Sequence, residues 1–317
     1  MSTTPIRDLE KFKKNALLNR WGLSYAEFRK SLTPHYSQVF LDILLGYILL
    51  LLSVYLPFLL WQRHPSWGIP LALVGGVSIG YWIAYLLLFI HEAAHYNLAP
   101  GRKLNDFLSN FFIASWAGLN TGSYRIIHWD HHRFLGKPND TEHSYFSALN
   151  FRFIVESITG LAAIKVILFR RKNTRASRSV LDRVMMLVGL VLNIGVAGFL
   201  WICLGWPLGL AWVLGLTSFF PFFGALRQLL EHRDNRASDQ IDYSKKPHGK
   251  VTRMFKEGPV GTTFGGAGFS RHLLHHWDPQ VSYTRLADIE AFLMGTDLKD
   301  GMTKSTYLLT FFELFKF

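Results

Sequence analysis

The chain has 317 residues, of which 50% are hydrophobic and 15% aromatic, and its 34 lysines and arginines outnumber 22 acidic residues to give a formal charge of +12. So high an apolar content favours a membrane protein over a soluble one. The single cysteine, Cys203, excludes an intrachain disulfide and any cysteine-ligated iron–sulfur cluster held by this chain alone. Residues 1–38 are charged and lack the apolar core and cleavage site of a signal peptide, so we expect the first membrane helix to target the chain.

Four apolar runs predict membrane-spanning helices. Residues 39–61 carry one charge near their start, and residues 69–90, 184–206 and 207–226 carry none. About 20 apolar residues in a helix cross a hydrocarbon core of about 30 Å. Short turns join the first run to the second and the third to the fourth. The sequence therefore predicts an all-α, polytopic membrane bundle made of two helical hairpins.

Two further apolar stretches do not fit a membrane span. Residues 107–119 are too few to cross the bilayer as a helix, so we expect a re-entrant or interfacial segment. Residues 151–169 contain Arg152, Glu156 and Lys165, and the first two share one helical face. This pattern predicts an amphipathic helix in the plane of the membrane interface.

The distribution of basic residues predicts the orientation of the bundle. All but one of the 34 lysines and arginines lie in segments 1–38, 91–183 and 227–317, and the exception is Arg63. By the positive-inside rule we expect these three segments to form a cytosolic helical cap. We expect residues 1–317 to form a single domain. The membrane would be a bacterial inner membrane or an equivalent one. The basic run 170–178 then favours contact with lipid headgroups over nucleic acid.

Eight of the 13 histidines fall in three short motifs that lie at the predicted cytosolic ends of the bundle. The motifs are HEAAH with His91 and His95, HWDHH with His128, His131 and His132, and HLLHH with His272, His275 and His276. Spacings of three and four residues place imidazoles on one face of a helix, as metal binding requires. The adjacent histidines of the second and third motifs can each supply a neighbouring metal. Ligation rich in imidazole and free of thiolate suits iron that must bind oxygen.

Other metal proteins explain this pattern less well. A zinc protease also uses HExxH, but it needs only one further ligand and would leave five clustered histidines without a role. A metal transporter would place its ligands inside the spans, where only Asp42, near an edge, is ionisable. A structural zinc site closes with four ligands, half of the number offered here.

The three motifs resemble the histidine boxes of the membrane fatty-acid desaturase and hydroxylase superfamily, in their order and in their position relative to the spans. The resemblance extends from about residue 39 to residue 290. It includes the stretches HHRFLGKPNDTE and HHWDPQVSYTRL after the second and third boxes. Two departures stand out: the third box begins with His272 and not with the glutamine common in front-end desaturases, and no HPGG cytochrome motif is present.

The resemblance implies a non-heme centre of two iron ions, bound by the eight box histidines, with O2 as co-substrate. It implies O2-dependent desaturation of a fatty acyl chain in a lipid. The same centre could instead hydroxylate an acyl chain, an alkane or an isoprenoid. A membrane metal-binding protein without catalytic activity is the non-enzymatic alternative.

Further candidates flank the boxes. The stretch GALRQLLEHRD resembles the Glu-His element of the alkane monooxygenases, which implies His232 as a ninth iron ligand. Carboxylates next to ligands commonly orient the far imidazole nitrogen. We expect this role for the acidic residues Glu92, Asp130, Asp140, Glu231 and Asp278. We expect no metal-binding role for the remaining histidines His35, His64, His143 and His248, of which His143 is the nearest candidate.

The electrons for such chemistry must come from another protein. The glycine-rich stretch 257–270 lacks both the GK[ST] of a phosphate loop and the GxGxxG of a dinucleotide fold, and one cysteine cannot hold a cluster. A ferredoxin, a rubredoxin or a b-type cytochrome that docks on the basic cytosolic cap is the expected donor. We expect a lipid acyl chain as substrate and no nucleic-acid partner.

Overall fold

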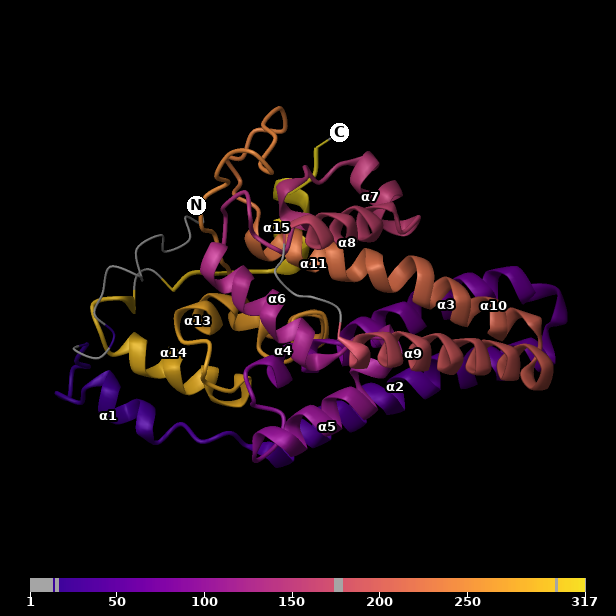
Figure 1. The fold of residues 1–317 in the computed structure, drawn as a ribbon, viewed down its shortest axis with the longest axis horizontal. Helices are drawn as coiled ribbons and strands as arrows, with labels where there is room; N and C mark the ends of the chain where they lie inside the picture. The colour runs from indigo at the N-terminus through magenta and orange to yellow at the C-terminus, as the bar shows by residue number, and fades with distance from the viewer. Residues whose placement is uncertain (1–13, 15–16, 174–178, 300–301, 317) are drawn as a thin grey trace.

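The computed structural model describes residue 14 and residues 17–173, 179–299 and 302–316. Its helices are α1 (Tyr25–Lys30), α2 (Tyr36–Arg63), α3 (Gly68–Leu86), α4 (Leu88–Ala94), α5 (Arg102–Phe112), α6 (Thr121–Phe134), α7 (Phe151–Ile158), α8 (Leu161–Asn173), α9 (Val180–Phe199), α10 (Trp206–Leu214), α11 (Phe220–His232), α12 (Pro259–Thr263), α13 (His272–Trp277), α14 (Leu286–Met294) and α15 (Tyr307–Leu314). Two short strands, β1 (Met254–Phe255) and β2 (Lys304–Ser305), pair in parallel. The long apolar helices lie together at one end of the molecule, and α4, α6 and α13 lie beside one another toward the other end (Figure 1).

Within the described residues, four helical segments are long and apolar enough to cross a membrane, which confirms the predicted bundle. They are Tyr36–Arg63, Pro65–Ala94, Val180–Leu204 and Trp206–His232. The third begins earlier than predicted because Ser179 and Asp182 form a capping box at its start. The fourth continues past residue 226 to His232 because the helix, through α11, runs beyond the apolar stretch into the cap.

Helix α3 lies at the centre of the bundle. In the most apolar part of each span, 61% of the residues are buried in the second span and 11% in the third, so α9 presents most of its surface to lipid. Small residues on α3 let α10 and the π-helical turn after it approach closely. A Cβ atom at Gly80 would lie 2.4 Å from the Cβ atom of Phe219. Such close contact is how helices associate where lipid removes the hydrophobic driving force.

Helix α5 is too short to span and shows a reversed amphipathic pattern. Its polar residues Asn105 and Ser109 are fully buried, whereas Phe107 and Phe111 are exposed. The Asn105 side chain accepts from the backbone N–H of Leu98 and donates to the backbone carbonyl of Ala93. Polar groups that face the protein and phenylalanines that face outward suit a segment in contact with lipid, in line with the predicted interfacial position.

The amphipathic helix predicted for residues 151–169 is two helices. The chain breaks at Gly160, whose φ of 75° lies in the left-handed region, and this separates α7 from α8. The predicted helical face is present, since Arg152 and Lys165 both donate to Glu156, at 2.8 and 2.7 Å. Part of the basic run 170–178 falls outside the described residues.

Contacts with α1 and with the residue before β1 hold α13 in place. Tyr25 of α1 packs against Trp277, at the end of α13, with ring centroids 4.6 Å apart and ring planes tilted by 53°. The backbone N–H of Leu273 donates to the carbonyl of Arg253, just before β1. The third histidine box is therefore anchored on two sides by segments that are far from it in sequence.

Candidate metal centre

The structure gathers nine histidines from four helices. His91 lies on α4, and His95 caps the end of that helix; α6 carries the second box, α13 carries the third, and His232 is the last residue of α11. The nine form two groups, in each of which the potential ligand nitrogens lie within 4.8 Å of one another. The first group is His91, His95, His128, His132 and His275, and the second group is His131, His232, His272 and His276.

Helical geometry explains how two boxes serve both groups. His128 and His132 are four residues apart on one face of α6 and enter the first group. His272 and His276 have the same spacing on α13 and enter the second group. His131, next to His132 on α6, lies in the second group. His275, next to His276 on α13, lies in the first group. Two helices thus exchange one ligand each, as the adjacent histidines of the sequence suggested.

The distances within each group match two donors on one ion. In the first group the Nε2 atom of His128 lies 2.9 Å from that of His95 and 3.0 Å from that of His132. In the second group the Nε2 atom of His272 lies 2.9 Å from that of His232 and 3.1 Å from that of His276. Metal–nitrogen bonds of about 2.1 Å place adjacent donors about 3.0 Å apart.

Burial keeps these imidazoles in the form that binds metals. It lowers the pKa of five box histidines outside the spans well below the ordinary value, with the neighbouring rings adding to the effect; they are His95, His132, His272, His275 and His276. A neutral imidazole offers one lone pair, and an imidazolium offers none. These five rings therefore present lone pairs to a metal at neutral pH.

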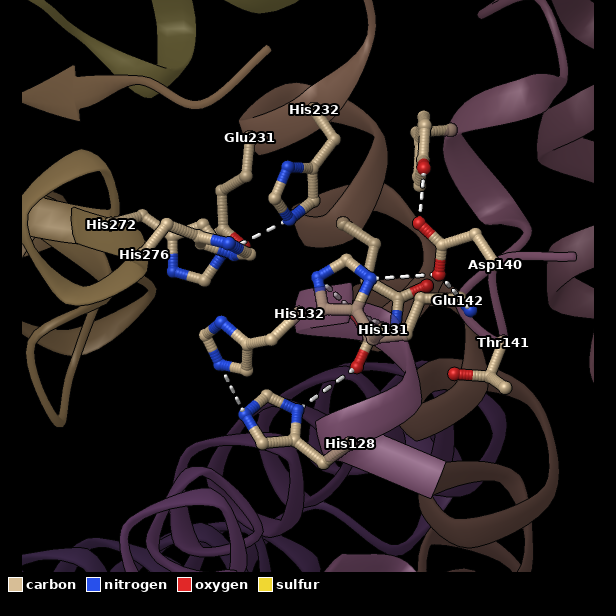
Figure 2. A network of polar contacts seen from close by, with 12 residues as sticks. His128, His131, His132, Asp140, Thr141, Glu142, Glu231, His232, His272 and His276 are labelled. Carbon is tan, nitrogen blue, oxygen red and sulfur yellow. Dashed lines mark hydrogen bonds and ion pairs between the residues drawn. The ribbon is translucent and has the colours of Figure 1, made fainter. Parts of the chain in front are cut away.

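Hydrogen bonds at the far ring nitrogens orient two ligands of the second group. Asp140 lies 2.8 Å from Nδ1 of His131, and the carbonyl oxygen of Val251 lies 2.8 Å from Nδ1 of His232. In both rings Nε2 is left to face the group (Figure 2). Burial opposes a charge on His131, but Asp140 and Glu142 together raise its pKa to about 9. Asp140 is itself held by the hydroxyl of Tyr145.

The other predicted carboxylates divide into two sets. Glu92 lies 3.6 Å from Nδ1 of His91, and Glu231 lies 3.9 Å from Nε2 of His272. Asp130 and Asp278 are not beside a histidine ring, and among the described residues neither has a ring nitrogen within 4.0 Å.

The expectation that Asp278 orients an imidazole is therefore corrected. Its carboxylate accepts from the hydroxyl of Tyr25 at 2.9 Å and from Nε of Arg29 at 2.6 Å, so it fastens α13 to α1. Asp130, which is half-buried, lies on a different face of α6 from the ligands on either side of it, because successive residues of a helix point in different directions.

Glu142 is a site residue that the sequence reasoning missed. Its carboxylate lies 3.6 Å from Nδ1 of His128 and 3.8 Å from Nε2 of His131. Burial would raise its pKa, but His131 and His128 hold that pKa well below the ordinary value. A signal was present in the motif PNDTEH, since Asp140 accepts from the backbone N–H of Glu142 in a tight turn. That turn brings the second acidic side chain to the same side as the first.

The four remaining histidines lie outside both groups. His143 packs on the ring of Phe169, His64 stacks on Trp67, and His35 accepts from Arg285. His248 is buried in the cap, where its Nε2 faces the backbone N–H of Asp234.

His248 makes the folded protein sensitive to acid. Burial lowers its pKa to about 4, below the usual value near 6.5. As pH falls from about 6.5 to 4, the unfolded chain binds a proton that the folded chain does not bind, so stability decreases across this window by about 3 kcal/mol. We expect the thermal midpoint of the metal-free protein to fall between pH 7 and pH 4.5, and to fall less in His248→Gln, which cannot titrate. Equal losses in the two proteins would contradict this assignment.

The donor set fits metal binding. Two buried nitrogens that face the groups, Nε2 of His91 and Nε2 of His131, have no hydrogen-bond partner among the described residues. Leaving such atoms unpaired in a protein interior costs about 1–3 kcal/mol each. A metal ion in each group would satisfy them, so the site is compatible with two ions held by imidazole.

Comparison with known proteins agrees with this geometry. The family model for fatty acid desaturases matches residues 69–307, most of the chain and all three histidine boxes. A 73-residue segment is 36% identical to a beta-carotene 4-ketolase from Protosiphon botryoides, and this match covers 23% of the chain and 18% of the ketolase. The four apolar helices and the grouped histidine boxes agree with the family match, and the chain belongs to the fatty acid desaturase family.

Proposed function

We propose that the protein is an O2-dependent desaturase that introduces a double bond into a fatty acyl chain of a membrane lipid. The observation that carries the proposal is the pair of imidazole groups, free of thiolate, at the end of an apolar bundle. Such ligation suits iron. Two bound iron ions would supply the oxidising chemistry, in which the two hydrogens removed from neighbouring carbons combine with O2, two electrons and two protons to give two waters.

The role of the chain is to hold and orient the metals. We assign all nine grouped histidines as ligands. Asp140, Glu92 and Glu231 would orient or support their rings, because each carboxylate lies against a ring of one group. Aromatic side chains enclose the site: Phe269 stacks against His272, and Tyr124 stacks against His128. This enclosure would limit water near the reacting carbon.

A groove between α9 and α10 favours a lipid substrate. It has a volume of about 490 Å³, within the usual range of ligand sites, and its lining includes Trp116, Gly118, Met186 and Trp212. The two polar side chains in its lining are engaged: Asn193 bonds to Trp116, Trp212 and its own helix, and the Thr217 hydroxyl donates to the backbone carbonyl of Val213. The groove therefore offers an apolar surface that faces the bilayer and ends where the chain turns into α6.

The electron donor would be a separate protein, a ferredoxin, a rubredoxin or a b-type cytochrome. Cys203, the only cysteine, is exposed on the third span, away from the histidines. One ligand of each group, His132 and His276, is only half-buried, so the centre comes nearest to the surface there. The exposed Arg133 and Lys137 lie beside His132 and would attract an acidic partner. The positive-inside rule places this surface in the cytosol.

Oxygenation of an isoprenoid is the second candidate, and the similarity to a beta-carotene 4-ketolase favours it. The same centre would serve, because insertion of oxygen after the first hydrogen abstraction gives an alcohol, and a second oxidation gives a ketone. The two reactions differ in how the chain holds the carbon relative to the metals, a difference of a fraction of an ångström.

Mass spectrometry of the products separates these reactions. We would express the protein in a host that supplies ferredoxin or cytochrome reductants and in a matched host that makes β-carotene. A lipid that has lost two hydrogens, only in the presence of O2, supports desaturation. A gained oxygen atom marks a hydroxylase, and a gained oxygen with two lost hydrogens in the carotenoid marks a ketolase.

The controls use histidines from the two classes. His275→Ala combined with His276→Ala removes one ligand from each group and is expected to abolish any product. His64→Ala, which alters only a ring stacked on Trp67, is expected to leave the product unchanged. No O2-dependent change in any lipid of either host would refute both candidate reactions.

A further inference from the structure

Among the residues that the structure describes, Glu142 is the one carboxylate that faces both histidine groups. Its Oε1 atom lies 3.6 Å from Nδ1 of His128, a residue of the first group, and its Oε2 atom lies 3.8 Å from Nε2 of His131, a residue of the second. Both ring nitrogens are buried and have no hydrogen-bond partner among the described residues. Figure 2 shows the Glu142 side chain beside His131, with a contact that reaches His128.

The two ring nitrogens have different functions. Nε2 of His128 points into the first group, 2.9 Å from Nε2 of His95, so Nδ1 is the far nitrogen of a ligand. In His131 the far nitrogen Nδ1 is already bound to Asp140, so Nε2 is the ligand nitrogen itself. Oε1 thus lies near the nitrogen of His128 that points away from the first group. Oε2 lies near the nitrogen of His131 that points into the second group.

Glu142 is held in place from two sides. Its backbone N–H donates to Asp140 at 2.9 Å, and Nε2 of Gln228 on α11 donates to Oε2 at 2.9 Å. Its side chain is only 11% exposed. A carboxylate so buried is costly unless charged or hydrogen-bonded partners surround it. Positive charge at both groups would provide that compensation.

We propose that Glu142 is a positioning residue that links the two metal centres, and this inference rests on the proposed di-iron site. Oε1, 3.6 Å from Nδ1 of His128, places negative charge behind that ring and favours its orientation toward the first centre. Oε2 lies 3.8 Å from Nε2 of His131 and places the same negative charge beside the second centre. The second centre has four imidazoles where the first has five.

Glu231 provides a natural comparison. It is also buried, more deeply than Glu142, and its carboxylate lies 3.9 Å from Nε2 of His272 in the second group. Its Oε1 atom is engaged by the hydroxyl of Tyr307 at 3.1 Å. No ring nitrogen of the first group lies within 4.0 Å of Glu231 among the described residues. A residue that supports one centre and a residue that links both can therefore be told apart by experiment.

The test uses the intact, iron-loaded protein and reads the metals directly. We would measure iron content, affinity for Fe²⁺ by competition with a chelator, and the ⁵⁷Fe Mössbauer spectrum of the reduced protein. In Glu142→Gln we expect both iron sites to change their spectra and both affinities to fall by roughly 10–100-fold. In Glu231→Gln we expect only one site to change. Glu156→Gln, at an exposed ion pair, should match the wild type.

Each other result has a defined meaning. Two unchanged iron sites in Glu142→Gln, or a change at only one, overturns the linking role. If Glu142→Gln does not fold, Glu142→Asp serves instead, because it keeps the charge but is too short by one methylene to reach both rings. Wild-type protein that binds no iron would count against the proposed di-iron function itself, which separates that failure from failure of the inference.

Discussion

Replacing His232 with alanine is expected to remove one of the two bound iron ions and to abolish O2-dependent turnover. His232 lies outside the three boxes, yet its Nε2 atom is 2.9 Å from that of His272, and its Nδ1 is fixed by the carbonyl of Val251. Loss of a supporting residue typically costs 10–100-fold in metal affinity, and loss of a ligand should cost more than about 100-fold. Iron content by elemental analysis and product formation measure the two effects.

A matched variant controls for general damage near the site. His143→Ala alters a histidine that packs on Phe169 and belongs to neither group. We expect it to keep both irons and most of its activity. A His232→Ala protein with two irons and normal turnover would show that the second centre needs only His131, His272 and His276 from this set.

Replacing Gly80 with leucine is expected to disrupt the bundle and both metal groups. A Cβ atom there would lie 2.4 Å from the Cβ atom of Phe219 and 2.8 Å from both the carbonyl oxygen of Gly215 and the backbone nitrogen of Phe220. Backbone atoms cannot move aside as a side chain can, so we expect a loss of about 3 kcal/mol or more. Thermal unfolding in detergent, with iron content measured in parallel, reports the change.

The metal groups would suffer because the helices at this contact lead to them. Helix α3 continues into α4 with His91, and Phe220 begins α11, which ends at His232. Gly195→Leu on α9 is the control, since no atom lies within 4 Å of a Cβ placed there. A leucine that faces lipid should leave the midpoint unchanged. If both variants unfold at the same temperature, the close contact between α3 and the π-helical turn Gly215–Phe219 is not what holds the bundle together.

Several features could be predicted because they depend on neighbouring residues only. A membrane span needs a run of apolar residues, so residues 39–61 and 69–90 could be predicted as spans from the sequence. In the structure the two helical segments are longer, Tyr36–Arg63 and Pro65–Ala94. The break at Gly160 was missed because a glycine inside an apolar, helix-like pattern does not by itself show that the chain turns there.

The supporting carboxylates could not be sorted from sequence. Asp140 and Asp278 each follow a histidine box within a few residues, yet Asp140 binds His131, whereas Asp278 binds Arg29 and Tyr25. Which partner an acidic group meets depends on the segment that packs against it. For Asp278 that segment is α1, which is more than two hundred residues away in the chain.

The sequence by itself determined the number of candidate spans and the presence of histidines at metal-ligand spacing, because apolar length and helical histidine spacing are local properties. Only the tertiary structure decided which imidazole belongs to which group. Nε2 of His132 meets Nε2 of His275 at 3.0 Å, while the adjacent His276 turns to His272 in the other group. That division, and the place of Glu142 between the groups, depends on how α6, α11 and α13 pack together. Contacts between segments so distant in the chain follow from the packing of the whole bundle and not from the spacing of residues within one helix.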